Sequence, residues 1–141
     1  MRPEELSRQL REGTGRFLAR RRGVVGTSLI SIGSMALISL YQTGVIKHLP
    51  DPPLPRFDSD GVDAAPEAYS MLSMPDAPIG LGSYAATLAL AAMGGEDRAR
   101  EKPLIPLALA AKAFVDAAQA AKLSVDQWKD HRAFCFCCLL G

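Results

Sequence analysis

The chain has 141 residues, which is enough for one domain. Hydrophobic residues make up 48% of the chain and charged residues 22%, and neither share excludes a soluble protein. The formal net charge of +1 gives no reason to expect binding to nucleic acid. All three cysteines lie within the last seven residues, so they cannot join distant segments, and the sequence excludes a disulfide scaffold.

The first predicted element is a membrane helix over the uncharged run 23–46, which follows a basic segment, residues 1–22. The run is longer than the about 20 residues that a helix needs to cross a bilayer. A signal peptide also combines a basic start with an apolar centre, but this run is too long and no A-x-A-like cleavage site follows it. Thr27, Ser31 and Ser34 share one helical face, which favours close packing against another helix.

Residues 47–78 predict a loop, because four prolines between positions 50 and 55 exclude regular structure there. Asp58, Asp60 and Asp63 together resemble the start of a calcium loop. Gly61, however, comes too early for that motif. We therefore expect a solvated acidic loop without a metal.

Two further apolar runs, 77–95 and 103–123, predict two more helices. The second of these carries Lys112 and Asp116, which are four residues apart and can pair on one face. It is either a membrane helix with an internal ion pair or an amphipathic helix at the membrane surface. The first interpretation is favoured because it gives the neighbouring membrane helices a partner.

The chain ends in a polar link with Trp128, a residue type common at lipid–water boundaries, and the apolar stretch 133–141. That stretch is too short to span a bilayer, so we expect it to begin a fourth helix in a truncated chain. The predicted fold is all-α: a transmembrane helical bundle of three membrane helices plus the start of a fourth. A basic N-terminal segment (1–22) precedes this membrane domain (23–141).

Basic residues predict the orientation of the bundle, because they gather on the cytoplasmic side of membrane proteins. The segment 1–22 holds seven arginines, and the link between the second and third helices holds Arg98, Arg100 and Lys102. Both are therefore expected in the cytoplasm. The acidic loop and the cysteines are then expected on the outer, oxidising side.

Cys135 and Cys138 have the C-x-x-C spacing of a dithiol that can open and close, with Cys137 between them. A position at a helix start and the basic residues Lys129, His131 and Arg132 would favour a thiolate. A zinc site with His131 lacks a fourth ligand, so no metal is predicted. Lipidation at a C-a-a-X end is atypical with a terminal glycine. An inert role as small apolar residues stays open.

These segments resemble the vitamin K epoxide reductase family, especially its bacterial members. The resemblance rests on Tyr69-Ser70, on the stretch 75–84 and on the final stretch 133–138. It implies a helical membrane bundle around a quinone of the ubiquinone or menaquinone type, located in the bacterial inner membrane with the C-x-x-C on the periplasmic side. It also implies a thioredoxin-like thiol protein as partner.

Carried over by position, Cys135 and Cys138 resemble the family's catalytic pair, in which Cys138 would face the quinone and Cys135 would exchange with the partner. The quinone pocket would be walled by residues of the stretch 78–84, namely Pro78, Gly80, Leu81 and Tyr84. The predicted function is a membrane thiol–quinone oxidoreductase.

The sequence departs from the family in its loop, which lacks the second cysteine pair that normally shuttles electrons from the substrate. The alternative function is therefore a non-catalytic membrane protein that binds a quinone, a lipid or a partner helix. A structural subunit of a larger membrane complex is a third hypothesis.

Overall fold

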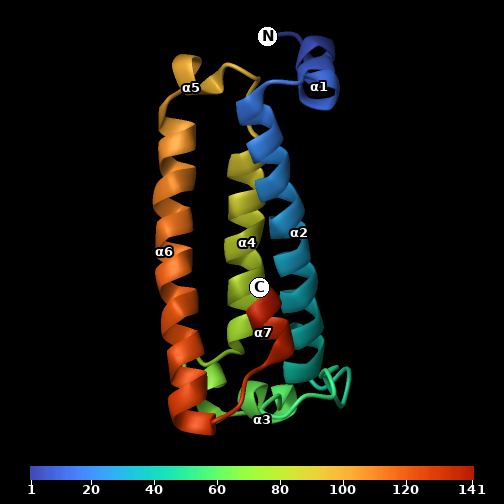
Figure 1. The fold of residues 1–141 in the computed structure, drawn as a ribbon, viewed down its shortest axis with the longest axis vertical. Helices are drawn as coiled ribbons and strands as arrows, with labels where there is room; N and C mark the ends of the chain where they lie inside the picture. Colours follow the sequence, from blue (N-terminus) through green and yellow to red (C-terminus); the bar gives the residue numbers. More distant parts are fainter.

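The computed structural model describes residues 1–141, and its regular elements are all helices, apart from one isolated bridge. Three long helices stand side by side (Figure 1), and they are α2 (Arg16–Gln42), α4 (Asp76–Ala92) and α6 (Leu104–Asp126). At one end of this bundle lie α1 (Pro3–Glu12) and α5 (Arg98–Glu101). The predicted all-α bundle is confirmed.

The opposite end of the bundle carries the short elements. These are α3 (Ser59–Asp63), the 3-10 helix η1 (Pro66–Tyr69), the π-helical turn η2 (Gln127–His131) and α7 (Phe136–Leu140). After η2 the chain turns back into the bundle, and α7 packs against α2 (Figure 1). The expected start of a fourth helix is therefore present as α7.

Two helices are long and apolar enough to cross a membrane: α2 and the continuous helix Leu104–His131. α4 is also apolar but has 17 residues. α6 buries none of its side chains, and Leu104 and Phe114 on it are 77% exposed. Exposed apolar surface of this extent suits a lipid environment.

The ends of the helices differ from the sequence prediction. α2 begins at Arg16, inside the basic segment, and ends at Gln42. The helix extends backwards because arginine has a high helix propensity and because Arg21 is anchored by contacts within the protein. The segment 47–78, predicted as a loop, contains α3 and η1.

Close packing of α2 on α4 is confirmed, but the face differs slightly from the prediction. Ser28, Ser31 and Ser34 are buried, whereas Thr27 is exposed. On α4, a Cβ atom added to Gly80 would lie 3.0 Å from Met35 Sδ of α2. The absence of a side chain at this position therefore lets the two helices approach each other.

Two arginines close the C-terminal end of α4. Arg21 donates hydrogen bonds to the carbonyls of residues 91–95, at 2.8–3.2 Å. Arg98 donates to the carbonyls of Leu90, Ala91 and Met93. The last carbonyls of a helix have no partner within the helix, and its C-terminus attracts positive charge. The two guanidinium groups therefore satisfy these carbonyls without any carboxylate.

We expect Arg21→Met to destabilise the bundle by about 2 kcal/mol, because buried carbonyls lose charged donors. Thermal unfolding in mild detergent, followed by circular dichroism, measures the change. Arg20→Met is the matched control, because Arg20 is exposed and should tolerate the change. Equal midpoints for the two variants would contradict this role of Arg21.

Candidate functional site

The site is assembled where the segment after α2 meets the segment before α7. Phe57 and Phe134 form a parallel bridge, in which Phe134 N–H donates to Arg56 O at 2.8 Å and Asp58 N–H donates to Phe134 O at 3.1 Å. Trp128 stacks on Phe134 at a centroid distance of 5.6 Å, and the Arg56 guanidinium lies 4.8 Å from the Trp128 ring. These contacts hold α3 against the start of α7.

Ser59, which is completely buried, joins the same two segments through its side chain. Its hydroxyl donates to Asp51 Oδ1 at 2.5 Å and accepts from Phe136 N–H at 3.0 Å. Phe136 is the first residue of α7, so Ser59 satisfies one of the backbone donors that a helix start leaves free. α3 is thereby fixed over the N-terminus of α7.

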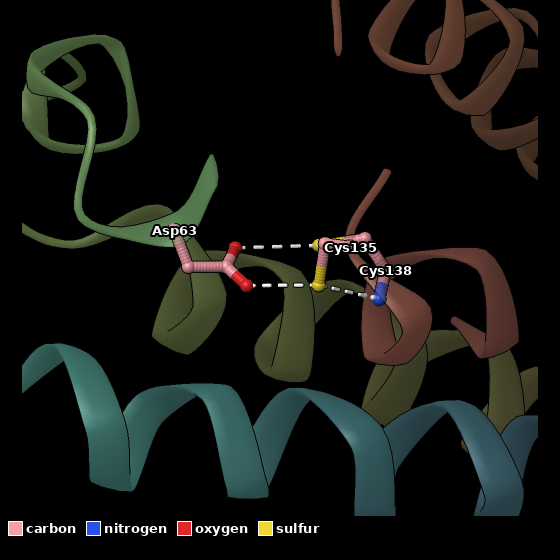
Figure 2. A group of neighbouring side chains, drawn as sticks. All are labelled: Asp63, Cys135 and Cys138. Carbon is pink, nitrogen blue, oxygen red and sulfur yellow. Dashed lines mark hydrogen bonds between the residues drawn. The ribbon is translucent and has the colours of Figure 1, made fainter. Parts of the chain in front are cut away.

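At this junction the carboxylate of Asp63, the last residue of α3, faces both thiols of the C-x-x-C pair (Figure 2). Cys135 Sγ donates to Asp63 Oδ2 at 2.8 Å, and Cys138 Sγ donates to Asp63 Oδ1 at 3.3 Å. Cys138 N–H in turn donates to Cys135 Sγ at 3.1 Å, so Cys135 caps α7. One carboxylate thus binds two thiols, one on each oxygen.

Asp63 is 3% exposed, which corrects the expectation of a solvated acidic loop for this residue. No cation lies within salt-bridge distance of its carboxylate. Burial raises the pKa of Asp63, while the hydrogen bonds from Cys135 and Cys138 act against this increase. Asp58 and Asp60 behave differently, because Asp58 caps α3 and Asp60 pairs with the exposed His48.

The electrostatic environment of the pair is also not the one that the sequence predicted. Lys129, His131 and Arg132 are exposed, and Arg132 lies 5.5 Å from the Trp128 ring. The charged group in contact with the thiols is instead the carboxylate of Asp63. A neighbouring carboxylate disfavours a thiolate, which is the opposite of the effect that the sequence predicted from the three basic residues.

The three ligand atoms of Asp63, Cys135 and Cys138 lie within 4.8 Å of one another. Carboxylate and thiolate groups bind zinc, but a closed site requires four ligands, and this cluster offers three. Exposed His131 is not part of the group. Cys137 is buried in the apolar cluster with Ile38 and takes no part in the hydrogen bonds of the pair.

The predicted pocket residues Pro78, Gly80, Leu81 and Tyr84 lie in the first half of α4 and are all half-buried. Tyr84 lines a cavity of about 550 Å³ between α2, α4, α6 and α7, and its hydroxyl donates to Gly141 O at 2.5 Å. Pro78, Gly80 and Leu81 do not line this cavity. A volume of this size matches small-molecule sites, and half of the lining residues are hydrophobic, which fits a quinone.

The predicted ion pair on α6 borders the same cavity. Lys112 Nζ lies 2.6 Å from Asp116 Oδ2 and donates to Ser83 Oγ of α4 at 2.9 Å, and Asp116 is among the lining residues. Paired inward, the two charges avoid the cost of facing lipid. This arrangement agrees with the interpretation of α6 as a membrane helix.

The fold and the site define a helical membrane protein that holds a dithiol at the start of a short helix, and the end of this helix lines a cavity with both hydrophobic and polar residues. The chain belongs to the vitamin K epoxide reductase family, which matches residues 23–141. Members of this family are membrane proteins that oxidise thiols and reduce quinones. No curated protein and no solved structure matches the chain.

We expect Lys112→Met to lower stability by about 3 kcal/mol, because it leaves the Asp116 charge between α4 and α6 without a positive charge to balance it. The double variant Lys112→Met/Asp116→Leu should recover most of this loss. Thermal unfolding in detergent tests both. The matched control is Lys122→Met, which breaks an exposed pair with Asp126 at the same spacing and should leave the midpoint unchanged. A double variant as unstable as the single one would contradict the prediction.

Proposed function

We propose that this protein is a membrane thiol–quinone oxidoreductase whose reacting groups are Cys135 and Cys138. The observation that carries the proposal is the contact of both thiols with one buried carboxylate, at the start of the helix whose last residues, Leu139 and Leu140, line a cavity that would hold a quinone. An inert pair of small apolar residues would have no need of a buried carboxylate without a cation. Buried titratable groups gathered in this way mark functional sites.

In the proposed reaction, a thiolate of the partner attacks Cys135 Sγ of the Cys135–Cys138 disulfide, and Cys138 leaves as a thiolate. The partner's second thiol then resolves the mixed disulfide and leaves the C-x-x-C pair reduced. A bound quinone supplies the chemistry that accepts two electrons from the pair and takes up two protons. Of the four residues of α4 predicted to wall the quinone site, Tyr84 would contribute to it, because it lines the cavity, whereas Pro78, Gly80 and Leu81 lie outside the cavity.

A thioredoxin-like protein suits the role of thiol partner, because the loop 47–78 contains no cysteine that could relay electrons. The partner must therefore react directly with the C-x-x-C pair. Cys135 is completely buried and belongs to the same hydrophobic cluster as Leu49 and Val62. Exchange thus requires the segment that carries α3 to move away from α7.

The second candidate is a non-catalytic relative that binds a quinone or a lipid in the cavity. The observation that favours it is the burial of Cys135 together with the absence of loop cysteines. The two functions differ in whether the pair changes redox state with the quinone pool.

Thiol trapping in membranes separates them. We expect the fraction of oxidised Cys135–Cys138 to rise when quinone is added and to fall when the quinone pool is depleted. Cys135→Ser and Cys138→Ser should abolish the response, because a disulfide needs both sulfurs, and Cys137→Ser is the control that should retain it. If the oxidised fraction of the Cys135–Cys138 pair in wild-type protein does not change with quinone, the non-catalytic function is the one supported.

We further propose that the N-terminus is cytoplasmic and that the C-x-x-C pair lies on the periplasmic side of the inner membrane. In a variant without the three native cysteines, Leu54→Cys places a reporter on the exposed loop, and Arg100→Cys places one on α5. An impermeant maleimide added to intact spheroplasts should label the first and should label the second only after lysis. The reverse pattern would invert the orientation.

A further inference from the structure

The two hydrogen bonds of the Asp63 carboxylate exist only while the pair is reduced. Both donors are S–H groups, on Cys135 and Cys138. When the disulfide forms, both S–H bonds break and the two donors disappear. A carboxylate that is 3% exposed and has no cation nearby is then left without a hydrogen-bond donor. An unpaired buried charge is costly, and such groups take up a proton instead.

We propose that Asp63 is the proton acceptor of the C-x-x-C pair, binding one proton when the Cys135–Cys138 disulfide forms and releasing it when the disulfide opens. One residue can serve both sulfurs because each thiol is bonded to a different oxygen of the same carboxylate. This inference rests on the thiol–disulfide chemistry of the proposed function, and it does not depend on the identity of the electron acceptor.

The protons and electrons balance as follows. On oxidation by a quinone, two S–H bonds break, one S–S bond forms, and two electrons pass to the quinone. Asp63 keeps one of the two thiol protons, so the hydroquinone receives the other one together with a proton from water. On reduction by a partner dithiol, its two protons end on Cys135 and Cys138, and Asp63 returns its proton to water.

The direction of the effect follows from the groups around Asp63. In the reduced state burial raises the pKa of Asp63, and the hydrogen bonds from the two thiols make this increase smaller. Oxidation removes these hydrogen bonds. Burial and the neighbouring negative charges, which raise the pKa, then act alone, so the pKa of Asp63 is higher in the oxidised state. Between the two pKa values the oxidised protein carries one more proton on Asp63 than the reduced protein does.

The other polar groups near Asp63 do not oppose this increase in its pKa. Gln42 of α2 is neutral, and its side-chain amide donates to the backbone carbonyl of Asp63 and to Asp76 Oδ1. The charged groups that act on Asp63 are carboxylates, and both raise its pKa: Asp51 of the loop and Asp76 of α4. Tyr41 of α2 and Cys137 of α7 are close enough to be influenced by Asp63.

The test is the pH dependence of the midpoint potential of the pair, measured in the full chain in detergent with dithiothreitol redox buffers and thiol trapping. If Asp63 binds no proton, oxidation of the Cys135–Cys138 pair releases two protons together with two electrons. With Asp63 binding one proton on oxidation, only one is released, so the slope against pH is halved. We expect this half slope in wild-type protein at every pH that lies between the pKa of Asp63 in the reduced state and its higher pKa in the oxidised state.

Asp63→Asn should restore the full two-proton slope, a twofold increase over wild type, because the amide cannot bind the proton. Asp60→Asn is the matched control, because Asp60 lies in the same short helix but contacts His48 and Leu49 rather than the thiols, and it should keep the half slope. A merely structural role of Asp63 would change the potential but not its slope.

A full slope in wild-type protein would overturn the inference, and this measurement does not require any variant to fold. The same result would leave the proposed function intact, because the pair would still form a disulfide. If no disulfide forms in any redox buffer, both the inference and the proposed function are wrong. If the disulfide forms in dithiothreitol buffers but its fraction in membranes does not change with quinone, the proposed function is wrong and the inference about Asp63 stands.

Discussion

The contact between the Asp63 carboxylate and the two thiols is the interaction on which the site depends. It joins a residue from the segment after α2 to the start of α7, more than 70 positions later in the chain. Without it, the C-x-x-C pair would only cap a five-residue helix, since Cys138 N–H would still donate to Cys135 Sγ. With it, the redox state of the sulfurs determines whether a buried charge is satisfied. Local packing and sulfur chemistry are therefore coupled at one carboxylate.

Much of the fold follows from the sequence because the membrane imposes simple rules on composition. A predominantly apolar run of sufficient length forms a helix in lipid, where every backbone polar group needs an internal partner. The runs 23–46, 77–95 and 103–123 correspond to α2, α4 and α6 for this reason. The pairing of Lys112 with Asp116 was predictable from helix geometry, since residues four apart share a face. The start of α2 was not predictable from the sequence, because Arg21 is held by carbonyls at the end of α4 that are distant in the sequence.

The site was only half predictable, because its two halves carry signals of different kinds. The spacing of Cys135 and Cys138 is a local pattern that indicates a dithiol whatever surrounds it. Asp63 has no such pattern, and its place in an acidic, proline-rich segment is typical of a solvated loop. Asp63 is buried where the segment after α2 meets the start of α7, and the bridge between Phe57 and Phe134 that joins these segments is a tertiary contact that no local rule predicts. The capping of α3 by Asp58 is the only local indication that this segment is ordered.

Buried charges occur at both ends of the bundle, and the contrast between them separates structure from function. Arg21 and Arg98 are satisfied by carbonyls at the end of α4, which are permanent features of the fold. Their charge matches the helix terminus, so they contribute to stability in every state of the protein. Asp63 is satisfied by thiol groups, which are weak donors and are consumed by oxidation. A protein selected only for stability would place a permanent donor there, such as an arginine or a backbone N–H. The choice of reactive donors is therefore explained by chemistry at the sulfurs rather than by packing.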